Sequence, residues 1–151
     1  SAKGKAQQAG LVKKGEWLVQ FKKQLIQDIT TSGYPHPVAK KSGGTVPGGV
    51  KIASEDRIES RSQYGSVPIP WVDMVPQMIA NMAIYFAKSN LPAEQLGERQ
   101  WLVGVYLVQA GMAREGRAML VDASQRKSEY LDHLALFPDG GGAAAPPNSS
   151  Q

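Results

Sequence analysis

The sequence predicts an α+β fold in which an N-terminal helix leads into a small curved antiparallel β-meander of about four strands and then into a C-terminal helical bundle. Three observations lead to this prediction. Apolar residues recur every three or four positions near the N-terminus, alternate with polar residues in the middle of the chain, and return to the helical period after Pro76. A length of 151 residues suits one domain, or two very small ones that share a core.

The N-terminal helix is predicted over residues 11–33, and residues 1–10, which are small and polar, are expected to form a disordered linker. Gly33 suits the left-handed position that commonly ends a helix. Because the helix is apolar on one side, we expect its part around Trp17 and Phe21 to cover one face of the strands. The stripe consists of Trp17, Leu18, Phe21, Leu25 and Ile29.

Short strands and tight turns are predicted over residues 37–70. Gly43-Gly44 indicates a hairpin turn, and Pro47-Gly48-Gly49 indicates a bulge or sharp bend, because interior glycine and proline weaken a plain strand. The strand that ends at Pro70 contains two prolines, which confine the segment to a sheet edge or a strand end. These strands have too few apolar residues for a core of their own, so the sheet is expected to pack against helices.

The helical bundle is predicted over residues 75–137, with Asp73 as a candidate N-cap before Pro76. A second helix opens at Pro92 and ends at Gly111, and it is apolar on more than half of its circumference, which predicts burial from two sides. A third helix follows, and a short one ends near Leu136. Residues 138–151 are of low complexity and are expected to form a disordered tail.

Trp71 stands at the corner where the strand pattern stops and the helix pattern starts. Tryptophan is usually mostly buried, so we interpret Trp71 as a core residue that joins the β portion to the α portion. The alternative is an exposed aromatic platform for a ligand.

Two resemblances extend this interpretation. Trp101-Leu-Val-Gly104, Gly111, Gly116 and Leu120 resemble a single tetratricopeptide-type helical hairpin, although Leu107 and Ser128 stand where that repeat has tyrosine and proline. The runs 21–28, 48–50, 65–71 and 115–120 resemble an accessory module found at the C-terminal ends of large multidomain bacterial proteins, some with a Ser/Thr protein kinase domain upstream. That resemblance covers roughly residues 17–137 and implies an appended, noncatalytic part.

The residues that carry chemistry form no catalytic pattern, and we expect neither an enzyme nor a cofactor. The two histidines, His36 and His133, lie far apart without metal-ligand spacing, and both are expected to be exposed. There is no cysteine, and no Gly-x-Ser-x-Gly elbow marks a nucleophile. The paired glycines between the strands lack the Gly-Lys-Ser/Thr of a phosphate-binding loop. A hydrolase with an unrecognised site near either histidine remains a weaker alternative.

Charge is distributed unevenly along the chain. Residues 1–51 carry nine lysines and two acidic residues, a net charge of +7, whereas residues 52–151 carry a net charge of −3. A basic segment can bind nucleic acid, an anionic membrane surface or an acidic partner, or it can simply be a solvated lysine-rich tail and helix face. The candidate partner-binding residues are Lys22, Lys23, Lys40, Lys41, Arg57 and Arg61.

The predicted function is therefore a noncatalytic protein-interaction or scaffolding module whose partner is a protein segment or a neighbouring domain. The alternative is a nucleic-acid-binding module that uses the basic N-terminal third and a strand face carrying Lys40, Lys41, Lys51, Arg57 and Arg61. No run of about 20 apolar residues predicts a membrane span. The absence of cysteine is compatible with any compartment; a bacterial, cytoplasmic location is the slight preference.

Overall fold

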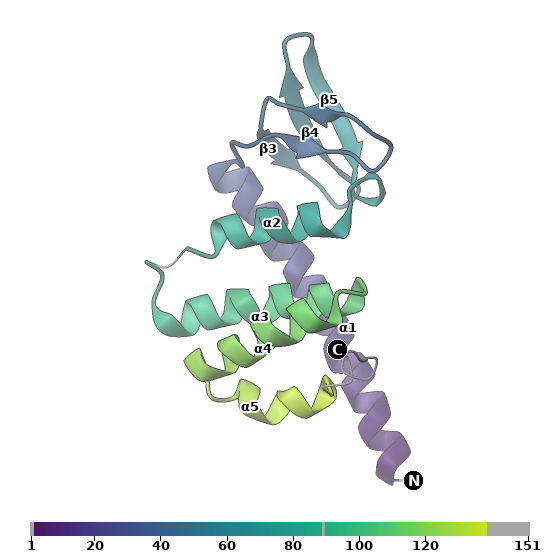
Figure 1. The fold of residues 1–151 in the computed structure, drawn as a ribbon, viewed down its shortest axis with the longest axis vertical. Helices are drawn as coiled ribbons and strands as arrows, with labels where there is room; N and C mark the ends of the chain where they lie inside the picture. The colour runs from purple at the N-terminus through teal and green to yellow at the C-terminus, as the bar shows by residue number, and fades with distance from the viewer. Residues whose placement is uncertain (1, 89, 139–151) are drawn as a thin grey trace, which may run out of the picture. The chain divides into compact units, whose positions relative to one another are not determined.

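The computed structural model describes residues 2–88 and 90–138 and has an α+β fold, as the sequence predicts (Figure 1). Its contacts divide the chain into two compact units. The helical unit comprises Ser1–Phe21 and Ala87–Gln151, and the β unit comprises Lys22–Phe86. The structure thus differs from the single domain predicted over residues 11–137. The tail predicted over residues 138–151 lies, apart from Pro138, outside the described residues.

The first helix, α1 (Ala2–Ser32), contributes to both units. It begins at Ala2, so the prediction of a disordered linker over residues 1–10 is wrong. Alanine, lysine and glutamine, which are common here, have high helix propensity, and Gly10 is buried where a Cβ would lie 2.9 Å from Leu136 Cδ2. The predicted end is confirmed: Gly33 has a φ of 77° and donates its N–H to the Ile29 carbonyl at 2.8 Å.

Five strands of the β unit form two antiparallel sheets, where about four strands in one meander were predicted. The two-stranded sheet pairs β1 (Val38–Ala39) with β2 (Thr45–Val46), and the three-stranded sheet has the order β3 (Val50–Ala53), β4 (Arg57–Ser62), β5 (Gly65–Pro70). The bend predicted at residues 47–49 separates the two sheets. The strand with two prolines, β5, lies at an edge, because proline cannot donate to a second neighbour.

The turn between β1 and β2 is longer than the predicted two residues. The Lys40 N–H donates to the Gly44 carbonyl at 3.0 Å, which leaves three residues between them. Both Gly43 and Gly44 have positive φ, of 107° and 84°. Glycine is used twice here because other residues adopt this conformation at a cost.

The β unit also contains α2 (Pro76–Phe86) and the last part of α1. The inward residues Ile58 and Ile69 are paired across β4 and β5 and are fully buried. The same unit buries Leu25 and Ile29 of α1 and Met82 of α2. The strands thus share a unit with helices, but α2 belongs with the strands and not, as predicted, with the bundle of residues 75–137.

The corner at Trp71 differs from the prediction. Trp71 opens a short 3₁₀ helix, η1 (Trp71–Asp73), and is half-buried, with its indole N–H donating to the Ser54 carbonyl at 2.8 Å. It is therefore neither a fully buried core residue nor a free aromatic platform. Asp73 does not cap the next helix either. Its carboxylate accepts two hydrogen bonds from Ser42, one from the backbone N–H at 2.9 Å and one from the side-chain hydroxyl at 3.0 Å.

In the helical unit, α3 (Ala93–Gln109) and α4 (Ala113–Arg126) form an antiparallel hairpin around Gly111, whose φ is 92°. They lie side by side in Figure 1, followed by α5 (Tyr130–His133) and η2 (Leu134–Leu136). The two helices approach closely through glycine. A Cβ on Gly116 would lie 2.7 Å from the Val108 backbone nitrogen, and one on Gly104 would lie 2.9 Å from the Gly116 carbonyl oxygen.

An aromatic cluster forms the core of the helical unit. Trp101 is fully buried, stacks on Tyr130 with a centroid distance of 4.3 Å, and meets the edges of Trp17 at 5.2 Å and Phe137 at 5.7 Å. Phe21 stacks on Tyr106 at 4.6 Å. Trp17 and Phe21 thus pack in the helical unit, and the prediction that they cover the strands is wrong. The helical spacing of the apolar residues places Trp17 and Phe21 on one side of α1, but it does not determine which strands or helices pack against that side.

We expect the protein to become less stable at alkaline pH, because Tyr130 of this cluster and the neighbouring Lys127 lose their protons there. Burial raises the pKa of the Tyr130 hydroxyl to about 12, and a hydrogen bond to Glu98 raises the pKa of Lys127. Both groups hold their protons more tightly when folded. The contribution of Tyr130 is complete below the ordinary tyrosine pKa of about 10 and is lost as pH rises towards 12, and the contribution of Lys127 is lost at still higher pH. Urea unfolding followed by circular dichroism between pH 8 and pH 12 checks this. Tyr130→Phe keeps the stacked ring and should show a smaller decline; parallel curves for both proteins would contradict the prediction.

Among the residues that the structure describes, none of the helices combines the length and the apolar character needed to cross a membrane.

Candidate functional site

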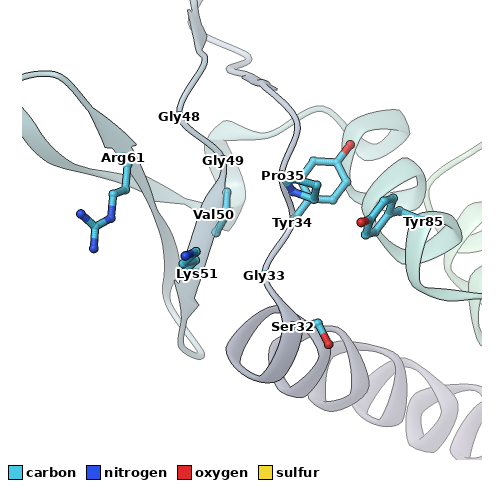
Figure 2. Close-up of a pocket in the computed structure, with 10 residues that line it drawn as sticks. All are labelled: Ser32, Gly33, Tyr34, Pro35, Gly48, Gly49, Val50, Lys51, Arg61 and Tyr85. Carbon is cyan, nitrogen blue, oxygen red and sulfur yellow. The ribbon is translucent and has the colours of Figure 1, made fainter.

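The candidate site is a pocket of about 520 Å³ within the β unit (Figure 2). This volume lies in the range of pockets that bind small molecules or parts of larger ligands, roughly 300–1,000 Å³. The end of α1, the connection that follows it, β3, β4 and α2 all contribute to its wall. The lining residues are Ser32, Gly33, Tyr34, Pro35, Gly48, Gly49, Val50, Lys51, Arg61 and Tyr85.

The pocket exists because the chain that leaves α1 crosses the start of β3. After the left-handed turn at Gly33, Tyr34 and Val50 exchange two backbone hydrogen bonds of 2.8 Å each. The prolines at positions 35 and 37 favour the extended conformation that this crossing needs. The crossing therefore brings the segment after a helix against a strand that begins 16 residues later.

Two glycines allow the backbones to approach at this crossing. Gly49 has a φ of 77°, and a Cβ on it would lie 2.9 Å from the Tyr34 carbonyl oxygen. A Cβ on Gly48 would lie only 1.8 Å from the Arg61 carbonyl oxygen, which no side chain tolerates. The Gly49 carbonyl accepts the Arg61 N–H at 3.1 Å and the buried Ser60 hydroxyl at 2.9 Å. The bend predicted from these glycines is confirmed, and it forms part of the pocket wall.

Aromatic rings form one end of the wall. Tyr34, Tyr85 and the exposed His36 meet edge to face, with all three centroid distances at 5.3 Å, an arrangement that aromatic pairs favour. Burial raises the pKa of the Tyr34 hydroxyl, and the neighbouring Tyr85 adds to the shift. The Tyr34 hydroxyl therefore stays neutral over the physiological pH range. This end of the wall offers ring surface together with hydroxyl groups.

Two cationic side chains form the other end of the pocket wall. Figure 2 shows Lys51 on β3 and Arg61 on the neighbouring strand β4, on the opposite side of Gly48 and Gly49 from Tyr85. The Lys51 stem lies against Gly33, where a Cβ would be 3.3 Å from Lys51 Cγ. Packing of the stem leaves the ammonium group to face water or a ligand. None of the residues that line the pocket is acidic.

The six cations predicted to bind a partner do not gather at one place. Arg61 lines the pocket, whereas Arg57, on the same strand, pairs with Glu59 at 3.4 Å. Lys22 lies 3.9 Å from Glu55 and 6.0 Å from the ring centroid of Trp71.

The three remaining lysines of that prediction also lie outside the pocket. Lys40 forms an isolated bridge to Met74, and the Lys41 N–H donates to the Asp73 carbonyl at 2.5 Å, so both belong to the β1–β2 turn region. Lys23 is exposed on α1. The predicted basic surface is thus dispersed over several elements.

Tyr34 and Tyr85 were missed as site residues, and Lys51 was named only for the nucleic-acid alternative. Tyr34 carries a usable signal, because it follows a helix-ending glycine and precedes Pro-His-Pro. Tyr85 carries none, since it lies beside the apolar stripe of α2 like many surface tyrosines. The histidines fall in different units, as expected, but His133 is half-buried and meets the edge of Trp17 at 5.2 Å, contrary to the prediction that it is exposed.

A scan against protein-family models finds no match to this chain, and searches of the curated proteins and of the solved structures find none either.

Proposed function

We propose that this chain is a noncatalytic protein-interaction module, appended to a larger bacterial protein, and that the pocket of the β unit binds a segment of a partner protein. The observation that carries the proposal is the composition of the wall. Edge-to-face tyrosines, exposed cations and bare glycine backbone share one cavity of about 520 Å³. Aromatic grooves with nearby polar groups are a recurring means of binding extended peptide segments.

The individual wall groups suit the parts of a peptide. The half-buried ring of Tyr85 offers apolar surface to a proline, aliphatic or aromatic side chain, and the buried ring of Tyr34 supports it edge to face. Their hydroxyl groups and the backbone of the glycine crossing can exchange hydrogen bonds with peptide groups. An extended segment places alternate side chains on opposite sides, so one residue can occupy the pocket while the backbone follows the rim.

Nucleic acid is the second candidate, and the juxtaposition of tyrosines and cations in one wall is the observation that favours it, because single strands bind to such surfaces. The outer face of β4 supports nucleic-acid binding less well than the pocket does. Glu59 lies between Arg57 and Arg61 on the outer face of β4 and is half-buried there. A phosphate backbone that follows this face would meet a carboxylate.

Peptide display tests the proposal. Random peptides displayed on phage are selected on the immobilised full chain, and the enriched peptides are synthesised and titrated. We expect Tyr85→Leu to weaken their binding about tenfold, since one aromatic contact in a hot spot is worth about 1–2 kcal/mol. Tyr64→Leu is the matched control, because Tyr64 is 90% exposed in the β4–β5 turn and lies outside the pocket.

Fluorescent single- and double-stranded oligonucleotides are titrated in parallel at low salt. Failure to enrich any peptide, or equal binding by Tyr85→Leu, would overturn the proposal. Oligonucleotide binding that falls steeply with salt, without peptide binding, would favour the second candidate.

A further inference from the structure

The charged side chains of the pocket wall are all cationic. Lys51 and Arg61 are the two charged residues of its wall, and none of the lining residues is acidic. On the strand of Arg61, the nearest acid is Glu59, and both of its carboxylate oxygens are already engaged, one by Arg57 at 3.4 Å and the other by the Ser66 hydroxyl at 3.1 Å. The positive charge at this end of the pocket is therefore not balanced by the wall itself.

Some cations elsewhere in the described residues lie within ion-pair distance of a carboxylate, among them Lys22 with Glu55, Arg57 with Glu59, Arg126 with Asp122, and Lys127 with Glu98. Two cations that line one cavity without an acid create a positive potential there, and a cavity concentrates such a potential. The wall thus favours a negatively charged ligand.

The backbone at the glycine crossing adds hydrogen-bond donors. Among the backbone hydrogen bonds of the described residues, the N–H groups of Gly48 and Gly49 donate none, whereas the Gly49 carbonyl accepts two bonds. Successive backbone N–H groups next to cations form concave sites that bind oxyanions in many proteins. The missing side chains at both positions leave room for the Arg61 and Tyr34 backbones, and this close packing holds the two N–H groups in the pocket wall.

These observations lead to a statement about the ligand that rests on the function proposed above. We propose that the pocket selects protein segments that carry an oxyanion, either the carboxylate of an acidic side chain or a phosphorylated side chain, and that it holds this group at Lys51 and Arg61. The neighbouring residue of the segment then lies against Tyr34 and Tyr85. Arginine forms two parallel hydrogen bonds with either oxyanion, and lysine adds a point charge.

Fixed-residue peptide libraries test this statement on the full chain. Four libraries share random flanks and differ at one central position, which is glutamate, phosphoserine, glutamine or lysine. We expect retention of the glutamate or phosphoserine library at least about tenfold above the glutamine library, as one hydrogen bond to a charged group contributes enough for that ratio. The comparison between glutamate and phosphoserine identifies which source of the oxyanion is preferred.

A double variant, Lys51→Gln with Arg61→Gln, should abolish the preference for the charged libraries while it leaves the chain folded. Lys41→Gln with Arg114→Gln removes the same charge at two exposed positions outside the pocket and serves as the control. The control should retain the preference, and raised salt should weaken it in the wild type.

The outcomes separate the two proposals. Equal retention of all four libraries would overturn the oxyanion inference but leave peptide binding intact. An oxyanion preference that survives in the Lys51/Arg61 variant would overturn the assignment to this pocket. No retention of any library, together with no enrichment in peptide display, would overturn the proposed function and this inference with it.

Discussion

Replacing Trp101 with alanine is expected to lower the free energy of unfolding by about 3–5 kcal/mol, the range typical of tryptophan truncation in a core. Trp101 is fully buried at the centre of the aromatic cluster, and Tyr130 stacks on it with an interplanar angle of 3°. Its removal leaves a cavity bounded by rings, and rigid rings cannot collapse into the space as flexible side chains can. Urea unfolding of the full chain, followed by far-ultraviolet circular dichroism, measures the loss.

Trp101→Phe is the matched control. The indole N–H of Trp101 is buried and has no hydrogen-bond partner among the described residues, so its removal costs no hydrogen bond. A phenyl ring also keeps most of the stacking with Tyr130. We therefore expect Trp101→Phe to lose less than half of what Trp101→Ala loses. A loss below about 1 kcal/mol for the alanine variant, which is what exposed positions show, would mean that this cluster is not the core of the helical unit.

Gly48→Ala is expected to destabilise the β unit by about 3 kcal/mol, at the upper end of what overpacking usually costs. The added Cβ would lie 1.8 Å from the Arg61 carbonyl oxygen and 2.5 Å from its carbonyl carbon, so a backbone segment must move. Gly48 does not have a positive φ, and the expected loss therefore comes from the clash and not from backbone strain. Urea unfolding measures the stability, and ¹⁵N–¹H spectra show whether the amides of Tyr34, Val50 and Arg61 shift.

Gly15→Ala makes the same chemical change where there is room for it. A Cβ on Gly15 meets no atom within 4 Å, and the residue lies inside α1. Alanine there should leave stability unchanged or raise it by roughly 0.5–1 kcal/mol, because glycine is the poorer helix former. If Gly48→Ala behaved like Gly15→Ala, the close approach of the Gly48 backbone to the Arg61 carbonyl of β4 would be disproved, and with it the geometry of the pocket wall.

The two variants address different units, which has a practical consequence. Trp101 belongs to the helical unit and Gly48 to the β unit, while α1 contributes to both. If the loss in each variant were confined to its own unit, the two substitutions would have additive effects, as distant sites usually do. Strong coupling in the double variant would show that α1 transmits stability along its length.

The basic N-terminal third illustrates how charge along a sequence differs from charge in space. Of the predicted cations, Lys22 and Arg57 lie close to acids, and Lys40 and Lys41 are held in the β1–β2 turn region. Arg61 alone reaches the pocket, where it meets Lys51. A count of lysines therefore identified an excess of positive charge, but not which cations line the same pocket.

What the sequence by itself determined about this protein is local. The period of the apolar residues predicted the helices and strands, two prolines placed β5 at an edge, and Gly33 and Gly111 marked helix ends that the structure confirms at φ values of 77° and 92°. These features depend on backbone preferences and on neighbours within a few residues, which a sequence records directly.

Only the tertiary structure decided which surfaces meet. Trp17 and Phe21 could have covered strands or helices, because an apolar stripe specifies burial but not the partner. Tyr34 and Tyr85 are 51 residues apart in the sequence, and no local pattern predicts that their rings meet at 5.3 Å. The pocket arises where one backbone crosses another at two glycines, and such a contact depends on the path of the whole unit and not on any one segment.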